Sequence, residues 1–345
     1  QVTVILNDNG RSYAPTISRL SESLIRIRSN PTYMRRSRRL EQLAEGIPWV
    51  GELLERGINA TKAALREMFE PTAFFEALGV TYLGPFDGHN VIEVEEALAN
   101  AVRFDGPVVV HVLTQKGRGY KPAESDPIKH MHDTSGIKPG SYTEAFTESL
   151  IKAAESKPDL VAITAAMPDS TGLLPFRERF GDRCFDVGIA EQHAVTSAAG
   201  MAMGGLRPVV ALYSTFLTRA IDQINLDVSL HRLPVLFCID RAGITGDDGP
   251  SHHGLLDIVL LSKVPGITIF APSSYQELQQ MFEDALIQTS GPTAIRWPKT
   301  MAPQVDWDEV GQGLKARSVI SSSEPAEVCI LGLGKMLSTA TESAN

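Results

Sequence analysis

The feature that most constrains this chain is a series of short apolar runs separated by amphipathic segments. The runs are VTVIL, PVVVHVL, LVAIT, PVVALY, PVLFCI, ITIFA, TAIRW and EVCILGLG. Runs that are continuous rather than alternating are typical of strands buried on both faces of a parallel sheet. We therefore predict an α/β fold, in which helices join parallel strands by right-handed crossovers and cover both faces of each sheet.

Helices are predicted between these runs. Residues 90–104 are amphipathic, and the pairs Ser141–Glu144 and Ser274–Glu277 match the capping-box pattern at a helix start. Ligands of α/β folds bind at the carboxyl ends of strands. Polar residues that directly follow an apolar run are therefore the first candidates for a site.

Two aperiodic segments rich in Pro, Gly and charged residues, 119–141 and 299–318, predict domain boundaries. We expect the C-terminal part of one α/β domain plus a linker at 1–140, a complete second domain at 141–316, and the start of a third at 317–345. The chain begins inside one apolar run and ends soon after another, so we expect it to be a piece of a longer protein.

Charge and composition exclude several classes of protein. The chain has 32 Lys and Arg against 41 Asp and Glu, a net charge of −9, which disfavours nucleic-acid binding. The arginine-rich stretch 26–39 is interpreted as a solvated helical segment. No apolar run approaches the roughly 20 residues of a membrane helix, so we expect no membrane partner. Three cysteines without a CxxC pair indicate neither zinc nor disulfides, and fit a reducing compartment.

Two polar clusters follow apolar runs. Asn7, Asp8 and Asn9 are compatible with an ordinary turn or with Mg²⁺ bound by an amide and a nearby carbonyl; taken alone, they favour the turn. Loop 240–254, DRAGITGDDGPSHHG, crowds charges and imidazoles among glycines after PVLFCI, which favours a ligand site over a structural loop. A metal there is disfavoured, because adjacent histidines of an extended chain point apart.

Single residues at strand ends carry competing interpretations. Glu191 lies where a predicted buried strand meets a helix of small residues, and an unpaired carboxylate in apolar surroundings usually has a task. Tyr213 and Phe216 end another run, with core packing as the alternative for Phe216. Lys299 follows the run TAIRW and is either an anion ligand or a solvated charge.

In chain order, NDNGRSYAPT, KGRGYKPAESDP, DVGIAEQHAV, YSTFLTRAIDQ, DRAGITGDDGPSHHG and GPTAIRWPK resemble one family. That family is 1-deoxy-D-xylulose-5-phosphate synthase, thiamine-diphosphate enzymes related to transketolases. The resemblance covers essentially the whole chain and implies a thiamine-diphosphate-binding fold, with thiamine diphosphate and Mg²⁺ as cofactors. Its upstream Gly-Asp-Gly motif and complete third domain are not in this sequence, so we expect the piece alone to be inactive.

The resemblance implies a transferase that joins pyruvate and D-glyceraldehyde 3-phosphate to give 1-deoxy-D-xylulose 5-phosphate and CO₂, the first step of the non-mevalonate isoprenoid route. It implies a homodimer in the cytoplasm, with a plastid as the alternative location. Two other functions stay open. One is a different thiamine enzyme, such as a transketolase, which loop 240–254 argues against. The other is a non-catalytic subunit.

The resemblance also implies roles for residues at the cofactor. Glu191 matches the acid that hydrogen-bonds the aminopyrimidine ring, Phe216 the aromatic stacked on that ring, and Tyr213 a neighbouring active-site residue. Asn9 and the Arg11 carbonyl match the Mg²⁺ ligands.

The remaining matches concern the acceptor and the linker. Arg241 and Lys299 match the cations that hold the acceptor's phosphate, although many relatives have Arg in place of Lys299. Asp248 and His252 match residues that contact the acceptor. Tyr120 matches a tyrosine that contacts the cofactor. The linker histidine is His132, with His130 as the rival, because the spacing after Asp-Pro is one residue longer here.

Overall fold

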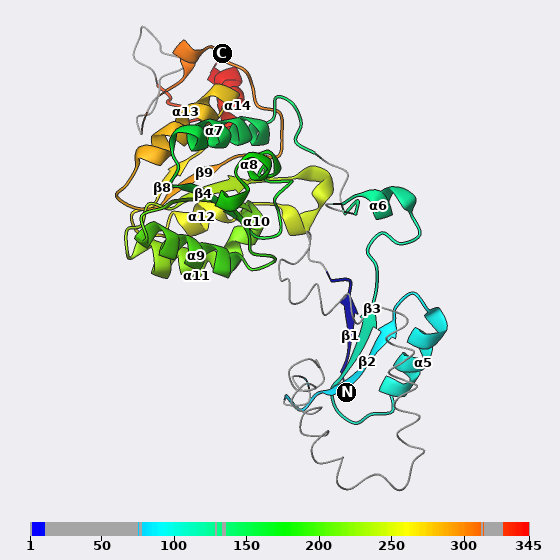
Figure 1. Cartoon of the computed structure of the whole chain (residues 1–345). Coiled ribbons are helices and arrows are strands. Elements are labelled where there is room, and N and C mark those ends of the chain that lie inside the picture. Colours follow the sequence, from blue (N-terminus) through cyan, green and yellow to red (C-terminus); the bar gives the residue numbers. More distant parts are fainter. Residues whose placement is uncertain are drawn as a thin grey trace, which may run out of the picture. The chain divides into compact units, whose positions relative to one another are not determined.

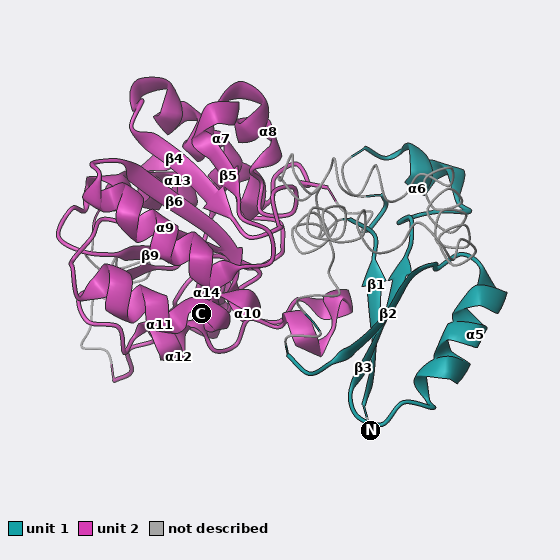
Figure 2. Cartoon of the chain, turned by 60° about the horizontal axis from the view of Figure 1, so that its bottom comes forward, with its two compact units in different colours: residues 1–133 teal, residues 134–345 magenta. Residues whose placement is uncertain are grey.

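The computed structural model describes residues 2–10, 75, 78–127, 130–132, 136–311, 313 and 327–344. Arg11 and the arginine-rich stretch 26–39 lie outside the described residues. The chain divides into two compact units, residues 1–133 and 134–345 (Figure 2). Each unit is built on its own parallel sheet.

Unit 1 carries a three-stranded parallel sheet in the order β1-β3-β2. The strands are β1 (Thr3–Asp8), β2 (Thr81–Asp87) and β3 (Val108–Leu113), and the helices are α5 (Val91–Ala101) and α6 (Lys121–Ser125). The predicted helix α5 begins at Asn90, whose side chain accepts a hydrogen bond from the Glu93 backbone N–H. It buries Ala97 and Ala101 against β3.

Two features of this sheet differ from the prediction. The first run, expected to be buried, leaves Val4, Ile5 and Leu6 exposed, because the described helix α5 packs against β2 and β3. Strand β2 was not predicted, because Gly84 and Pro85 interrupt its apolar pattern. The pairing of β2 with β3 continues past them with a shift of register.

Unit 2 carries a six-stranded sheet, order β5-β4-β6-β7-β9-β8, in which every pair is parallel. The strands are β4 (Leu160–Thr164), β5 (Cys184–Asp186), β6 (Arg207–Tyr213), β7 (Leu236–Asp240), β8 (Thr268–Phe270) and β9 (Thr293–Arg296). The α-helices are α7 (Tyr142–Ser156), α8 (Leu174–Arg179), α9 (Glu191–Met203), α10 (Ser214–Leu217), α11 (Ile221–Gln223), α12 (Asp257–Leu261), α13 (Tyr275–Ile287) and α14 (Met336–Ala344). The 3₁₀ turns are η1 (Gly181–Arg183), η2 (Thr218–Ala220), η4 (Gly246–Asp248), η5 (Pro250–His252) and η6 (Trp307–Glu309), and η3 (Ile224–Ser229) is a π-helix.

Helices cover both faces of this sheet, which confirms the predicted α/β architecture. Helices α7, α8 and α13 lie on one face, and α9, α11 and α12 on the other (Figure 1). Within β7, Leu236 and Cys238 belong to the first core, whereas Phe237 and Ile239 belong to the second. Both faces of the strand are therefore buried, which is why its apolar run is continuous.

The predicted helix starts are confirmed, with one difference. The N–H of Glu144 donates to Ser141 Oγ (3.2 Å), and that of Glu277 to Ser274 Oγ (3.1 Å). Each glutamate reaches back one residue further than the capping box predicts: Gly140 N–H donates to Glu144 (2.6 Å), and Ser273 N–H donates to Glu277 (2.5 Å). Both side chains thus satisfy backbone donors at the start of α7 and α13.

The strand predicted for EVCILGLG is wrong. Residues 327–333 form no strand in the described structure, and Val328 and Leu331 are exposed. A strand needs a neighbouring strand for its hydrogen bonds, and none pairs with this segment in the described part of the chain. No helix in the described ranges is long and apolar enough to cross a membrane.

Candidate functional site

The carboxyl end of the six-stranded sheet gathers most of the candidate residues. Helix α9 begins with Glu191 shortly after β5, Tyr213 is the last residue of β6, and Arg241 directly follows β7. Lys299 comes three residues after β9. The carboxyl ends of parallel strands lie together at one end of the sheet, so four distant parts of the chain place polar side chains there.

Glu191 is 2% exposed, at the first position of α9. The preceding strand was predicted to be buried, but β5 is a short edge strand with Phe185 exposed. The carboxylate has a counter-ion that the sequence analysis missed. A guanidinium nitrogen of Arg219 lies 3.4 Å from Oε1 and 3.3 Å from Oε2 of Glu191. Because Arg219 is half exposed, the buried negative charge is compensated by a cation that reaches solvent.

An aromatic pair lies beside this ion pair. The rings of Tyr213 and Phe216 are stacked, with centroids 5.7 Å apart and planes 18° apart. The His252 ring meets Phe216 edge-on at 5.4 Å, and its Nδ1 lies 3.0 Å from Ser251 Oγ. The Arg219 guanidinium carbon is 5.5 Å from the centre of the Phe216 ring. The Phe216 ring is therefore contacted both by His252 and by Arg219, the partner of Glu191.

Arg241 is almost fully buried, and its position is fixed from several sides. Its guanidinium donates to the Ser170 carbonyl (2.9 Å), lies 3.2 Å from Asp240 Oδ2, and has its carbon 3.9 Å from the centre of the Tyr213 ring. Its φ of 60° is in the left-handed region, which few non-glycine residues adopt. Several contacts therefore hold this side chain at the end of β7.

Asp240 is the buried counter-ion of Arg241. Its carboxylate accepts hydrogen bonds from the Arg241 backbone N–H (2.6 Å) and from the Thr143 hydroxyl (2.8 Å). Burial raises the pKa of Asp240, and the charge of Arg241 and the bond from Thr143 oppose that rise in part. Asp240 was predicted only as the first residue of the loop, although its position at the end of a buried strand was an available signal.

The part of loop 240–254 between Gly243 and Gly254, here called loop 243–254, adds a second carboxylate, that of Asp248. Lys299 Nζ is 2.6 Å from Asp248 Oδ1, and Arg241 Nε is 3.9 Å from Asp248 Oδ2. The base of the loop is pinned, because Gly243 and Gly254 exchange two backbone hydrogen bonds of 2.8 Å. One carboxylate is therefore shared between the two cations predicted to bind phosphate.

The predicted metal ligand Asn9 follows β1 in unit 1. The adjacent Asp8 shapes this turn: its Oδ1 accepts the Gly10 N–H (2.8 Å), and its Oδ2 lies 3.2 Å from His111 Nε2. His111 Nδ1 in turn lies 2.6 Å from the Tyr82 hydroxyl. These contacts of His111 were not predicted, although a histidine inside the apolar run PVVVHVL was a usable signal.

Of the other predicted residues of unit 1, Tyr120 and His132 lie at its surface, and His130 is half-buried. Tyr120 is 58% exposed at the start of α6, and His132 is exposed with its Nδ1 3.0 Å from Lys116 Nζ. His130 has a positive φ of 49°. Arg11 lies outside the described residues. No group of three or more His, Cys, Asp or Glu side chains able to hold a metal occurs in the described ranges.

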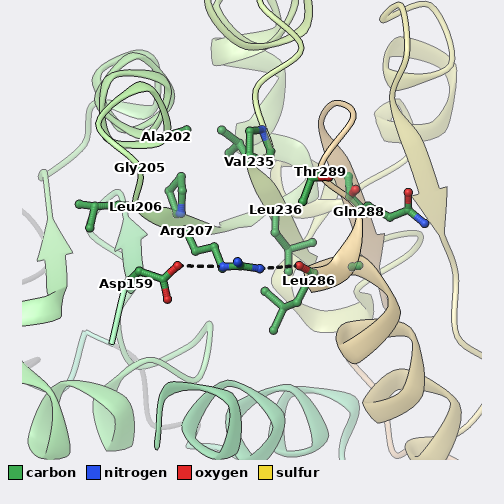
Figure 3. Close-up of a pocket in the computed structure, with 14 residues that line it drawn as sticks. Asp159, Ala202, Gly205, Leu206, Arg207, Val235, Leu236, Leu286, Gln288 and Thr289 are labelled. Atoms are coloured by element: carbon green, nitrogen blue, oxygen red, sulfur yellow. Dashed lines mark hydrogen bonds and ion pairs between the residues drawn. The ribbon is translucent and has the colours of Figure 1, made fainter. Parts of the chain in front are cut away.

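A cavity of about 140 Å³ lies at the opposite, amino end of the six-stranded sheet (Figure 3). It is lined by residues at the starts of β6, β7 and β9 and at the end of α13. Arg207 crosses it, donating to Asp159 (3.0 Å) and to the Leu286 carbonyl (2.9 Å). None of the candidate residues lines this cavity.

Comparison with known proteins gives two family matches. The family described as "1-deoxy-D-xylulose-5-phosphate synthase" matches residues 1–114, and "Transketolase, pyrimidine binding domain" matches residues 138–304. Proteins named 1-deoxy-D-xylulose-5-phosphate synthase are similar to the chain. The one from Mycobacteroides abscessus is 46% identical over 100% of this chain and 56% of its own length. The one from Mycobacterium tuberculosis H37Rv is 50% identical over 86% and 48%.

The chain spans about half the length of the curated relatives it matches. Among solved structures, one titled "Split gene transketolase, inactive beta4 tetramer" superposes with a TM-score of 0.44 and 26% identity. That superposition covers 51% of this chain and 56% of the other.

Proposed function

Because the chain belongs by sequence to the 1-deoxy-D-xylulose-5-phosphate synthase family, we propose that it takes part in the reaction that names the family. The reaction joins pyruvate to D-glyceraldehyde 3-phosphate with loss of CO₂. The observation that carries the proposal is the convergence of a buried carboxyl, Glu191, and two cations, Arg241 and Lys299, at one end of one sheet.

The residues around Glu191 fit thiamine diphosphate. When bound, this cofactor provides the electron sink for the decarboxylation of pyruvate. Glu191 offers a carboxyl group shielded from water, which can hydrogen-bond a ring nitrogen without competition from solvent. Phe216 and Tyr213 offer a stacked aromatic pair beside it, against which a flat ring can pack.

Arg219 compensates the charge of Glu191 at the same site. Its guanidinium faces both carboxylate oxygens, so the buried carboxylate is not left unpaired before a ligand arrives. Because Arg219 is half exposed, it can turn toward solvent when Glu191 takes a different hydrogen-bond partner. We propose Arg219 as a residue that positions Glu191.

The acceptor end of the site is assigned to loop 243–254 and its neighbours. Arg241 presents a planar fork and Lys299 a point charge, the two kinds of cation that bind phosphate. His252, a residue of this loop, has its ring against Phe216 and can give or take a proton at the acceptor's carbonyl or hydroxyl.

For Mg²⁺ we propose the Asn9 side-chain amide and the Arg11 carbonyl, as the resemblance implies. The described part of the turn fits this role: Asp8 is engaged by Gly10 and His111, so the backbone on either side of Asn9 is held in place. Tyr120 stays a prediction as a cofactor contact, and His132 stays a prediction as the active-site linker histidine.

We further propose that the chain acts as a homodimer in a bacterial cytoplasm. Apolar side chains are exposed on α9, in and just after the π-helix η3, and on loop 243–254, among them Met203, Leu226, Leu230 and Ile244. We propose that a second copy of the chain covers these exposed apolar side chains. The bacterial source of the similar proteins supports the location. Sedimentation at two protein concentrations measures the assembly state.

The test of the function is product identification. The enzyme that contains this chain is incubated with pyruvate labelled at its carboxyl carbon, D-glyceraldehyde 3-phosphate, thiamine diphosphate and Mg²⁺. Release of labelled CO₂ together with 1-deoxy-D-xylulose 5-phosphate supports the proposal. Transfer of a two-carbon unit between sugar phosphates without CO₂ would indicate a transketolase instead, and cofactor binding without turnover would indicate a non-catalytic subunit.

A further inference from the structure

The side chain of Asp248 lies where the proposed function needs an anion from the substrate. Its Oδ1 is 2.6 Å from Lys299 Nζ, and its Oδ2 is 3.9 Å from Arg241 Nε. We propose that Asp248 is an internal counter-ion that occupies the phosphate position, and that a phosphorylated acceptor displaces it. This inference rests on the proposed function and adds to it the residue that makes the site selective for phosphorylated acceptors.

The carboxylate of Asp248 fits this position poorly. Its Oδ2 is buried and has no hydrogen-bond partner, and the 3.9 Å to Arg241 is too long for a hydrogen bond. A buried oxygen without a donor is unfavourable. A phosphate group has three terminal oxygens and more negative charge, so it can accept from Lys299 and Arg241 at once. The two cations are therefore better matched to phosphate than to the carboxylate that they hold here.

The loop that carries Asp248 has a base fixed by hydrogen bonds and a loosely packed tip. Its base is pinned by the pair of hydrogen bonds between Gly243 and Gly254. Asp248 lies between Gly246 and Gly249, whose φ values of 72° and 81° lie in the region that glycine adopts without strain. Nothing lies within 4 Å of a Cβ built on either glycine, so the backbone on both sides of Asp248 is loosely packed.

Asp247, the residue before Asp248, differs from it in exposure and in ion pairing. It lies in the same 3₁₀ turn and carries the same charge, but it is exposed and makes no ion pair in the described part of the chain. The turn thus directs one of two adjacent carboxylates to the cations and the other to solvent. Removing the charge of Asp247 or of Asp248 changes the net charge of the loop by the same amount. Only the removal of the Asp248 charge leaves the phosphate position without an anion.

The displacement explains why a phosphate-free acceptor would be disfavoured. A neutral aldehyde brings no anion to exchange, so Asp248 stays paired with Lys299 and the tip of the loop stays in place. A phosphorylated acceptor replaces one anion by a better one, and the tip of the loop moves only for that ligand. Asp248 acts through Lys299 and Arg241, and is therefore a residue that determines specificity by positioning.

The first experiment titrates the full chain with inorganic phosphate by calorimetry at low ionic strength. Asp248→Asn, which keeps the size of the side chain, is expected to bind phosphate about tenfold or more tightly than wild type, because one charge-assisted hydrogen bond no longer competes. Asp247→Asn is the matched control, with an expected change below about twofold, since an exposed charge is largely screened. Far-UV circular dichroism and the thermal midpoint check that both variants fold.

The second experiment places Asp248→Asn in a Lys299→Met background. The gain in phosphate affinity is expected to fall below about threefold there, because the cation that the carboxylate neutralises is gone. In the enzyme, Asp248→Asn is expected to lower KM for D-glyceraldehyde 3-phosphate while leaving KM for pyruvate unchanged.

Equal or weaker phosphate binding by Asp248→Asn would overturn the inference, even if the enzyme makes the expected product. Conversely, phosphate binding that follows the expected pattern in a protein that forms no 1-deoxy-D-xylulose 5-phosphate would overturn the proposed function and leave the counter-ion role in place.

Discussion

The two ends of the six-stranded sheet differ in how deeply their charged side chains are buried. At the carboxyl end, the side chains of Glu191, Asp240 and Asp257 are at most 3% exposed, each beside an arginine. At the amino end, Arg207 and Asp159 form a pair in which both side chains are about one-third exposed. Burying a charge costs several kcal/mol per ion unless its partners compensate, so folding alone gives little reason to bury so many. The contrast indicates that the carboxyl end retains its charges for chemistry.

The same contrast appears in the pKa values of two aspartates that each face an arginine. Burial raises the pKa of Asp240 despite Arg241, whereas the hydrogen bond from Arg207 lowers the pKa of Asp159. Residue type and partner are the same in both cases. The access of water therefore decides the direction.

The largest effect is expected for Glu191→Gln at the carboxyl end. If the carboxyl group activates the cofactor, the enzyme should lose about 10²- to 10⁴-fold in turnover, the usual range for a general acid or base. Exchange of the C2 proton of bound thiamine diphosphate for deuterium measures that step directly. Glu283→Gln, an exposed residue paired with Lys152, is the control and should leave the exchange unchanged. Wild-type exchange in Glu191→Gln would remove this residue from the mechanism.

The second-largest effect is expected for the stability of the Asp240→Ala variant. Asp240→Ala leaves Arg241 buried without its counter-ion and should lower the free energy of unfolding by about 3–5 kcal/mol. Asp159→Ala at the amino end should cost at most about 1 kcal/mol, because its pair is partly solvated. Urea unfolding of both variants under the same conditions measures the difference. Similar losses in the two variants would contradict the contrast between the two ends.

A smaller effect is expected for Lys299→Ala. Loss of one charge-assisted hydrogen bond to phosphate, worth about 1.5–3 kcal/mol, should raise KM for D-glyceraldehyde 3-phosphate roughly 10- to 150-fold and leave KM for pyruvate nearly unchanged. Lys299→Arg should be tolerated, since Arg also binds phosphate. If glyceraldehyde without phosphate suffers equally, Lys299 does not bind the phosphate.

The smallest effect is expected at the amino end. Because the folded-state pKa of Asp159 is lowered by Arg207, its stabilising contribution is present above the unfolded pKa of about 3.9 and is lost as pH falls through the folded value. Arg207→Ala should therefore cost at most about 1 kcal/mol at pH 7. The difference from wild type should shrink below about pH 4. Urea midpoints at pH 7, 4 and 3.5 measure it, and a difference that grows on acidification would reverse the assignment.

The sequence by itself determined the features that depend on neighbours along the chain. Continuous apolar runs marked the buried strands of the second sheet, because both faces of those strands are covered by helices. Ser141 and Ser274 marked two helix starts, because a cap acts within a few residues. Candidate residues at the carboxyl ends of strands could be named in advance, because parallel strands share that edge.

Only the tertiary structure decided what depends on partners far away in the chain. Residues 327–333 look like a strand, yet they form none in the described structure, because no described strand pairs with them. Arg219 became the partner of Glu191 across 28 residues, and His111 met Asp8 across 103. The apolar run of β1 proved exposed because the described helix α5 packs against β2 and β3. Periodicity and caps are local signals, whereas strand pairing and the compensation of buried charge arise only when the chain is folded.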